Sequence, residues 1–173
     1  MTWTPRLDFL PIAPFRTNIS AAIMEHQVEA LAWAAGQCGI TTTLPPLVAI
    51  YGARAVRDKY PVANVLIMGE DPRDTNGGDC DESKRLLIEF EMLASDGEDL
   101  IGQLEAYVLM GRSIITEMTE EELTAGVNTE RESILVSVGS VRYGERKYES
   151  KNKFVQVGSI IATISYREVE REG

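Results

Sequence analysis

Residues 154–168 read FVQVGSIIATISYRE and carry the last and longest strand pattern in the chain. Apolar side chains recur there on one parity, and a period of two is typical of a β-strand. A second run, 84–94, reads KRLLIEFEMLA and alternates in the same way. The residues that share the apolar face are Phe154, Ile160, Ala162, Ile164 and Tyr166 in the first run and Leu86, Ile88, Phe90, Met92 and Ala94 in the second. Both runs predict strands that cover an apolar core.

Further strands are expected at 47–51, 62–69 and 133–143, where apolar residues are continuous or alternate. Helices are expected where apolar residues recur every three or four positions. One such stripe begins at Ile19, in a helix that Thr17, Asn18 or Ser20 can cap, and a second covers 100–118. The members of the first stripe are Ile19, Ile23, Val28, Leu31 and Ala35.

This order of elements predicts an α+β fold, because strands joined by hairpins alternate with helices. We expect a mostly antiparallel β-sheet with two main helices packed on one face and an extended N-terminal arm. The expected boundaries are an extended proline-rich arm at 1–17, a single domain at 18–168 and a charged tail at 169–173.

The expected arm combines three prolines with several large apolar residues. Prolines at this density disfavour a regular helix or a central strand. The segment is also too apolar for a solvated tail, so we expect it to pack on its own domain or on a neighbouring subunit. Its candidate anchors are Trp3, Phe9 and Phe15.

Composition restricts the classes of function. The chain has 173 residues, which fits one domain, and its 17 basic and 27 acidic side chains give a net charge of −10. That balance argues against binding to nucleic acid or to an anionic membrane through the neutralisation of phosphates. The first residues lack a signal-peptide pattern, and no apolar run approaches the roughly 20 residues that cross a bilayer. We expect a soluble cytoplasmic protein, with Cys38 and Cys80 reduced.

Catalytic signatures are missing from the sequence. The one histidine, His26, falls in the middle of the first expected helix, and no nucleophile elbow, phosphate loop or dinucleotide fingerprint occurs. The acidic loop expected at 70–83 lacks the ligand order of an EF-hand. We therefore expect no enzyme activity, cofactor or resident metal. A weak cation site in the acidic loop, or a small ligand-binding domain or enzyme that uses this loop with Tyr143 or Tyr148, stays open.

The charges are segregated along the chain. Residues 70–99 hold 11 acids against 3 bases, whereas the basic hairpin loop expected at 142–153 holds five bases against two acids. Separated patches of opposite sign suit a subunit that packs head to tail around a ring, although ordinary solvated loops would also show them. The candidate interface residues are Asp71, Asp74, Asp79, Asp81 and Glu82 in the acidic loop and Arg146, Lys147, Lys151 and Lys153 in the hairpin.

The layout from Tyr60 onward resembles a known family. Tyr60-Pro61 precedes an apolar strand and a Gly-rich acidic loop, and an Ala-Ser-Asp-Gly-Glu-Asp turn at 94–99 then opens a helix. A loop leads to SVGSVRY at 137–143, and the chain closes with ATISYRE at 162–168. Over residues 18–168 this order is similar to that of the tail terminator proteins of tailed bacteriophages, also called neck or tail-completion proteins.

The resemblance implies a structural virion protein with an α+β fold, assembled in the cytoplasm of the bacterial host. Such proteins close into a homo-oligomeric ring, usually a hexamer, that caps the tail tube and meets the head–tail connector protein. The implied partners are other copies of the chain, the tail tube protein and the connector, with DNA only as cargo in the lumen and no membrane. A different connector or tail tube morphogenesis protein is the nearest alternative.

Overall fold

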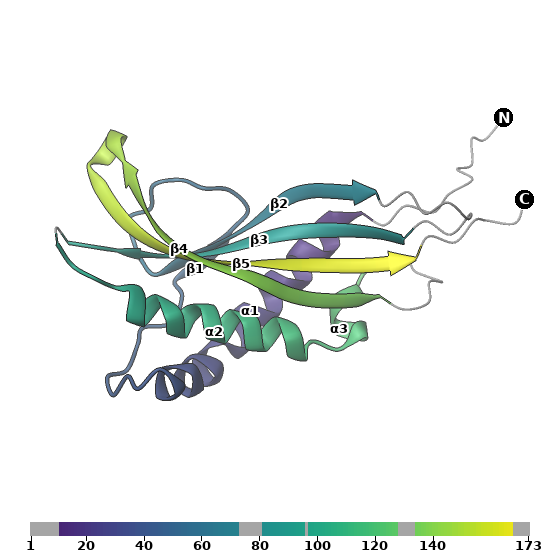
Figure 1. Cartoon of the computed structure of the whole chain (residues 1–173), viewed down its shortest axis with the longest axis horizontal. Helices are drawn as coiled ribbons and strands as arrows, with labels where there is room; N and C mark the ends of the chain where they lie inside the picture. Colours follow the sequence, from purple (N-terminus) through teal and green to yellow (C-terminus); the bar gives the residue numbers. More distant parts are fainter. Residues whose placement is uncertain (1–10, 73–80, 96, 128–133, 168–173) are drawn as a thin grey trace, which may run out of the picture.

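The computed structural model describes residues 11–72, 81–95, 97–127 and 134–167. Within them lie three α-helices, five strands and one short 3-10 turn (Figure 1). In chain order these elements are α1 (Ile12–Gln37), β1 (Ala49–Tyr51), β2 (Val62–Pro72), β3 (Asp81–Leu93), α2 (Ile101–Glu117), α3 (Glu120–Thr124), β4 (Leu135–Tyr148), the turn η1 (Glu149–Lys151) and β5 (Lys153–Arg167).

The strands form one sheet in the order β1-β2-β3-β5-β4. The short β1 runs parallel to β2, and the other three pairs are antiparallel. The helices cover one face of this sheet, as Figure 1 shows. The predicted α+β class, with a mostly antiparallel sheet and two main helices, is confirmed.

The core lies between the helices and one face of the sheet. Alternate residues of β3 and β5, such as Ile88 and Ile160, meet the buried stripes of α1 and α2 there. Two glycines bring α2 close to the sheet. A Cβ atom at Gly111 of α2 would collide with the Phe90 ring, and one at Gly158 of β5 would lie 2.8 Å from Cγ2 of Val108.

The first helix begins earlier than predicted, at Ile12 rather than near residue 18. Pro14 is compatible with this start, because the first N–H groups of a helix have no partner within the helix. Phe15 is therefore a buried core residue of α1 and not the anchor of an extended arm, so the predicted arm boundary at residue 17 is wrong. Trp3, Phe9 and the predicted tail at 169–173 lie outside the described residues.

The basic hairpin loop predicted at 142–153 is mostly strand. β4 continues to Tyr148 and β5 begins at Lys153, so only the turn η1 and Asn152 connect them. A bulge between Gly139 and Arg142, where Ser140 has a φ of 53°, inserts one extra residue into β4. Beyond the bulge, odd-numbered and even-numbered side chains exchange faces. Simple alternation therefore did not predict that the strand continues.

The acidic loop predicted at 70–83 is also shorter. β2 runs to Pro72 and β3 starts at Asp81, and the pairs Asp71–Ser83 and Pro72–Glu82 extend the ladder into the predicted loop. Asp71, Asp81 and Glu82 therefore belong to strands, whereas Asp74 and Asp79 lie outside the described residues.

Candidate functional site

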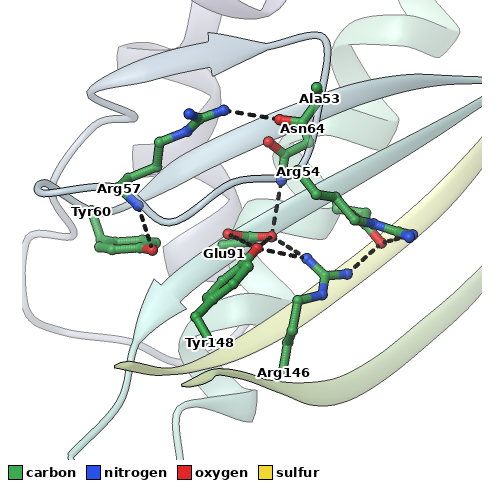
Figure 2. Close-up of polar contacts among 9 residues, drawn as sticks. Ala53, Arg54, Arg57, Tyr60, Asn64, Glu91, Arg146 and Tyr148 are labelled. Atoms are coloured by element: carbon green, nitrogen blue, oxygen red, sulfur yellow. Dashed lines mark hydrogen bonds and ion pairs between the residues drawn. The ribbon is translucent and has the colours of Figure 1, made fainter. Parts of the chain in front are cut away.

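The face of the sheet that the helices leave free carries a buried cluster of charged side chains (Figure 2). Its centre is a pair of carboxylates on alternate residues of β3. The side chain of Glu89 is 5% exposed and that of Glu91 is fully buried. Because an unpaired buried carboxylate is costly, each of them needs cationic or hydrogen-bonding partners.

Two arginines supply those partners. Arg54, from the irregular segment 52–61 that follows β1, donates from Nε and Nη2 to the two oxygens of Glu89 at 2.8 and 2.7 Å. Arg146 of β4 donates from Nη2 to Glu89 at 3.0 Å and from Nη1 to Glu91. The two guanidinium groups thus balance the two carboxylates, and Arg146 joins both of them.

Neutral donors complete the surroundings of Glu91. The Nδ2 atom of Asn64, on β2, donates to Oε1 of Glu91 at 2.9 Å. The Tyr148 hydroxyl lies 3.2 Å from the same oxygen and donates to it, while it accepts from Nη1 of Arg146 at 3.2 Å. The six side chains joined by these bonds are called the charge cluster below: Arg54, Asn64, Glu89, Glu91, Arg146 and Tyr148.

The environment separates the pKa values of the two carboxylates. Burial raises the pKa of Glu91 above its ordinary value and outweighs the opposing attraction of Arg146. Burial acts on Glu89 in the same direction, but its hydrogen bonds to Arg54 and the positive charges of Arg146 and Arg54 together lower its pKa.

The bonds of the charge cluster support a structural role for it, because they connect segments of the chain to one another. It connects the 52–61 segment to β2, β3 and β4, and Lys153 of β5 adds a bond from Nζ to the carbonyl oxygen of Arg57. The adjacent hollow, lined by Glu89, Arg142 and Arg146, has a volume of only about 170 Å³. Most polar groups of the cluster bond to one another, while Oδ1 of Asn64 is buried without a hydrogen-bond partner among the described residues. These bonds hold the covering segment on the sheet.

The four predicted basic interface residues lie in different surroundings. Arg146 bonds within the charge cluster, and Lys153 donates to the carbonyl oxygen of Arg57, so both side chains have partners within the chain. Their predicted role in an interface stays a prediction. Lys151 lies 3.4 Å from the exposed Asp58, and Lys147 is exposed on β4. The acidic strand ends at Asp71 and Asp81 lie at the opposite end of the sheet from the β4–β5 turn (Figure 1).

The alternative of a small ligand-binding or catalytic site needs residues that the described structure does not bring together. Tyr148 belongs to the charge cluster, whereas Tyr143 contacts Gly158 on the face that meets α2. His26 is exposed on α1. Within the part of the chain that the structure describes, no group of three or more His, Cys, Asp or Glu side chains is placed to hold a metal ion.

None of the described helices is both long and apolar enough to span a membrane.

Sequence reasoning missed the charge cluster. Alternation assigned Glu89 and Glu91 to a solvent-facing side of the strand, and nothing local marked them as buried. The available signal was two acids that lie two positions apart on one strand and so share a face. Their arginine partners at 54 and 146 become visible only with the register of the sheet.

A scan of known protein families finds no match for the chain, and a search of curated proteins finds none either. Among solved structures, the chain is similar to a protein chain in the virion of a native gene transfer agent particle. The sequence identity is 13%, the similarity covers 87% of this chain and 93% of that chain, and the TM-score is 0.42.

Proposed function

We propose that the chain is a ring-forming structural subunit of a virion, of the tail terminator or neck type. In this role a ring of copies caps the tail tube and meets the head connector. The observation that carries the proposal is the open edge of the sheet at β4. This strand has 14 residues, and within the described residues it is paired on one side only, with β5.

A long unpaired edge is a ready template for pairing with another chain, and monomeric proteins usually shorten or cover such edges. The opposite edge is open as well, because β1 pairs with β2 only from Val62 to Asn64 and leaves the described remainder of β2 without a strand on that side. Two open edges on one sheet allow each copy to use different surfaces toward its two neighbours. Such head-to-tail contacts close into rings when the rotation per copy allows it.

Acidic composition fits this role. A net charge of −10 disfavours adhesion to DNA phosphates, as the wall of a DNA passage requires. The sequence resemblance to tail terminators selects this type of ring over a tail tube, which would polymerise further.

The test is the solution mass of the purified chain by light scattering on a sizing column, at low and moderate salt, with electron microscopy of the same fractions. Closed rings of one defined mass are the expected result. Long cylinders would instead identify a tube subunit. A monomer at every concentration and salt, both alone and with the tail tube protein of the same virion, would overturn the proposal.

A further inference from the structure

α1 is apolar on both its buried and its exposed side. Its inner stripe fills the core, yet its outer side also presents large apolar residues: Val28 is 66% exposed, Trp33 48% and Met24 40%. A surface helix normally turns polar residues toward water. Two hollows flank this side. The first, of about 540 Å³, lies toward α2 and α3 at Trp33 and has a mixed polar and apolar lining, and the second, of about 350 Å³, lies toward the 40–46 segment at Val28.

The outer side of α1 is also acidic. Glu25 and Glu29 are exposed there, and no lysine or arginine follows Arg16 within the helix. The rim of the larger hollow adds Glu117 and Glu122, beside His26. An occupant of this surface would therefore combine apolar side chains with positive charge. The name α1 ridge is used below for Met24, Glu25, Val28, Glu29 and Trp33.

β4 presents those properties. Its exposed large apolar residues are Leu135, Val141 and Tyr143, at 67%, 40% and 38% exposure. Arg142 and Lys147 are exposed on this strand together with one acid, Glu145, so exposed bases outnumber exposed acids there, whereas Arg146 is used by the charge cluster. Of the eleven large apolar residues exposed in the described part of the chain, six belong to the α1 ridge or to β4.

The two surfaces lie at different borders of one molecule. α1 packs beside β1 and β2 at one edge of the sheet, and β4 forms the other edge with α2 behind it (Figure 1). The α1 ridge and β4 of one molecule therefore cannot contact each other, but the ridge of one copy can contact β4 of another. Such a contact uses a different patch on each partner, which is the heterologous arrangement that generates rings.

We infer that the α1 ridge is the docking surface for β4 of a second copy of this chain, with Val28 and Trp33 as apolar anchors and Glu25 and Glu29 opposite Arg142 and Lys147. The inference rests on the proposed ring and assigns the α1 ridge, in place of the open edge at β2, as the surface that receives β4.

The decisive experiment uses two single variants of the full chain, Val28→Asp and Val141→Asp, each of which introduces a charge at an exposed position. Light scattering should show at least a roughly tenfold rise in the concentration needed for assembly in each, because burial of an apolar anchor dominates such contacts. An equimolar mixture should form a complex of two chains, since each variant keeps the surface that the other lacks. Circular dichroism and thermal melting verify that both variants are folded.

Charge exchange gives the second test. Glu25→Lys/Glu29→Lys and Arg142→Glu/Lys147→Glu should each weaken assembly several-fold, and the chain that carries all four changes should regain it. The matched controls Glu120→Lys and Lys59→Glu change exposed residues outside both surfaces and should assemble like the wild type.

The outcomes separate this inference from the proposed function. A wild-type chain that never assembles contradicts both. Wild-type rings that Val28→Asp and Val141→Asp leave intact contradict the assigned surfaces alone. Self-association of Val141→Asp at wild-type strength would show that the α1 ridge pairs with itself. Rings that persist in Val28→Asp but no longer bind the tail tube protein would assign the ridge to that partner. Either result overturns the inference while the ring stands.

Discussion

On the side of β3 that meets the helices, Ile88 and Phe90 are covered by apolar side chains, whereas on the other side Glu89 and Glu91 are covered by guanidinium groups, an amide and a hydroxyl. Both sides exclude water, but they tolerate change differently. The apolar side depends on filled volume, while the charged side depends on every partner being present, because breaking a buried pair leaves an uncompensated charge.

Removing the Phe90 ring tests the apolar side and has the largest expected effect. Phe90→Ala leaves a cavity beneath Gly111 that a packed helix cannot refill, so the free energy of unfolding should fall by about 3–5 kcal/mol in urea denaturation. Phe90→Leu, which keeps most of the volume, serves as the control and should lose clearly less. A loss below about 1 kcal/mol for Phe90→Ala would show that this side is not a packed core.

Removing the shared arginine tests the charged side. Arg146→Ala deprives Glu91 of its cation and Glu89 of one of two, so we expect a loss of about 3 kcal/mol in the free energy of unfolding. Arg112→Ala, at an exposed arginine of α2, is the matched control and should stay within about 0.5 kcal/mol of the wild type. Equal losses in the two variants would mean that the charge cluster adds nothing specific.

The pH dependence sharpens the contrast between the two carboxylates. Because the pKa of Glu91 is raised in the folded state, its contribution is lost as the pH rises from the ordinary glutamate range through that raised value. Because the pKa of Glu89 is lowered, its contribution is present above the ordinary range and is lost as the pH falls through the lowered value.

Glu91→Gln isolates the first effect. The variant is neutral at every pH, so its stability relative to the wild type should increase as the pH is raised from about 4 through the range in which Glu91 ionises in the folded protein. The pKa of Glu89 is lowered, so its own contribution changes mainly below this range. Urea denaturation at several pH values measures the difference, and a constant difference across this range would contradict the raised pKa of Glu91.

The smallest effect is expected at the exposed pair of Lys151 and Asp58. Their charged atoms lie 3.4 Å apart with side chains 56% and 86% exposed, so water and salt screen the attraction. Lys151→Ala should leave the urea midpoint unchanged within experimental error. A clear drop would indicate that the β4–β5 turn holds the 52–61 segment through this pair and not through the charge cluster.

Much of the fold could be predicted from the sequence because its core-facing strands alternate simply. Residues of β3 and β5 that alternation assigned to the core, such as Ile88 and Ile160, are buried there. The helix predicted at 100–118 agrees with α2 within a residue at each end. The predictions failed where local rules were overridden. Pro14 and Phe15 suggested an extended arm because proline was weighed without its tolerance in a first helical turn. The bulge at Ser140 reversed the alternation of β4.

The site was harder to predict because its chemistry depends on the register of the sheet. Glu91 and Arg146 are 55 positions apart in sequence and meet only through the pairing of β3, β5 and β4. Charge segregation placed Arg146 in an exposed loop, whereas the structure places it in β4. The roles of Lys147 and of the acids beyond Pro72 in an interface stay predictions.

The glycines that bring α2 close to the sheet also constrain how the molecule can deform. With Phe90 against Gly111 and Val108 against Gly158, side chains of one layer occupy the gaps left by missing side chains in the other. Sliding α2 along the sheet, or turning it about its own axis, would drive a backbone into a ring or a methyl group. Since packed interiors are nearly incompressible, this layer resists shear as one solid piece. Mechanical load on the molecule would therefore be carried across the helix–sheet layer without sliding between the two layers.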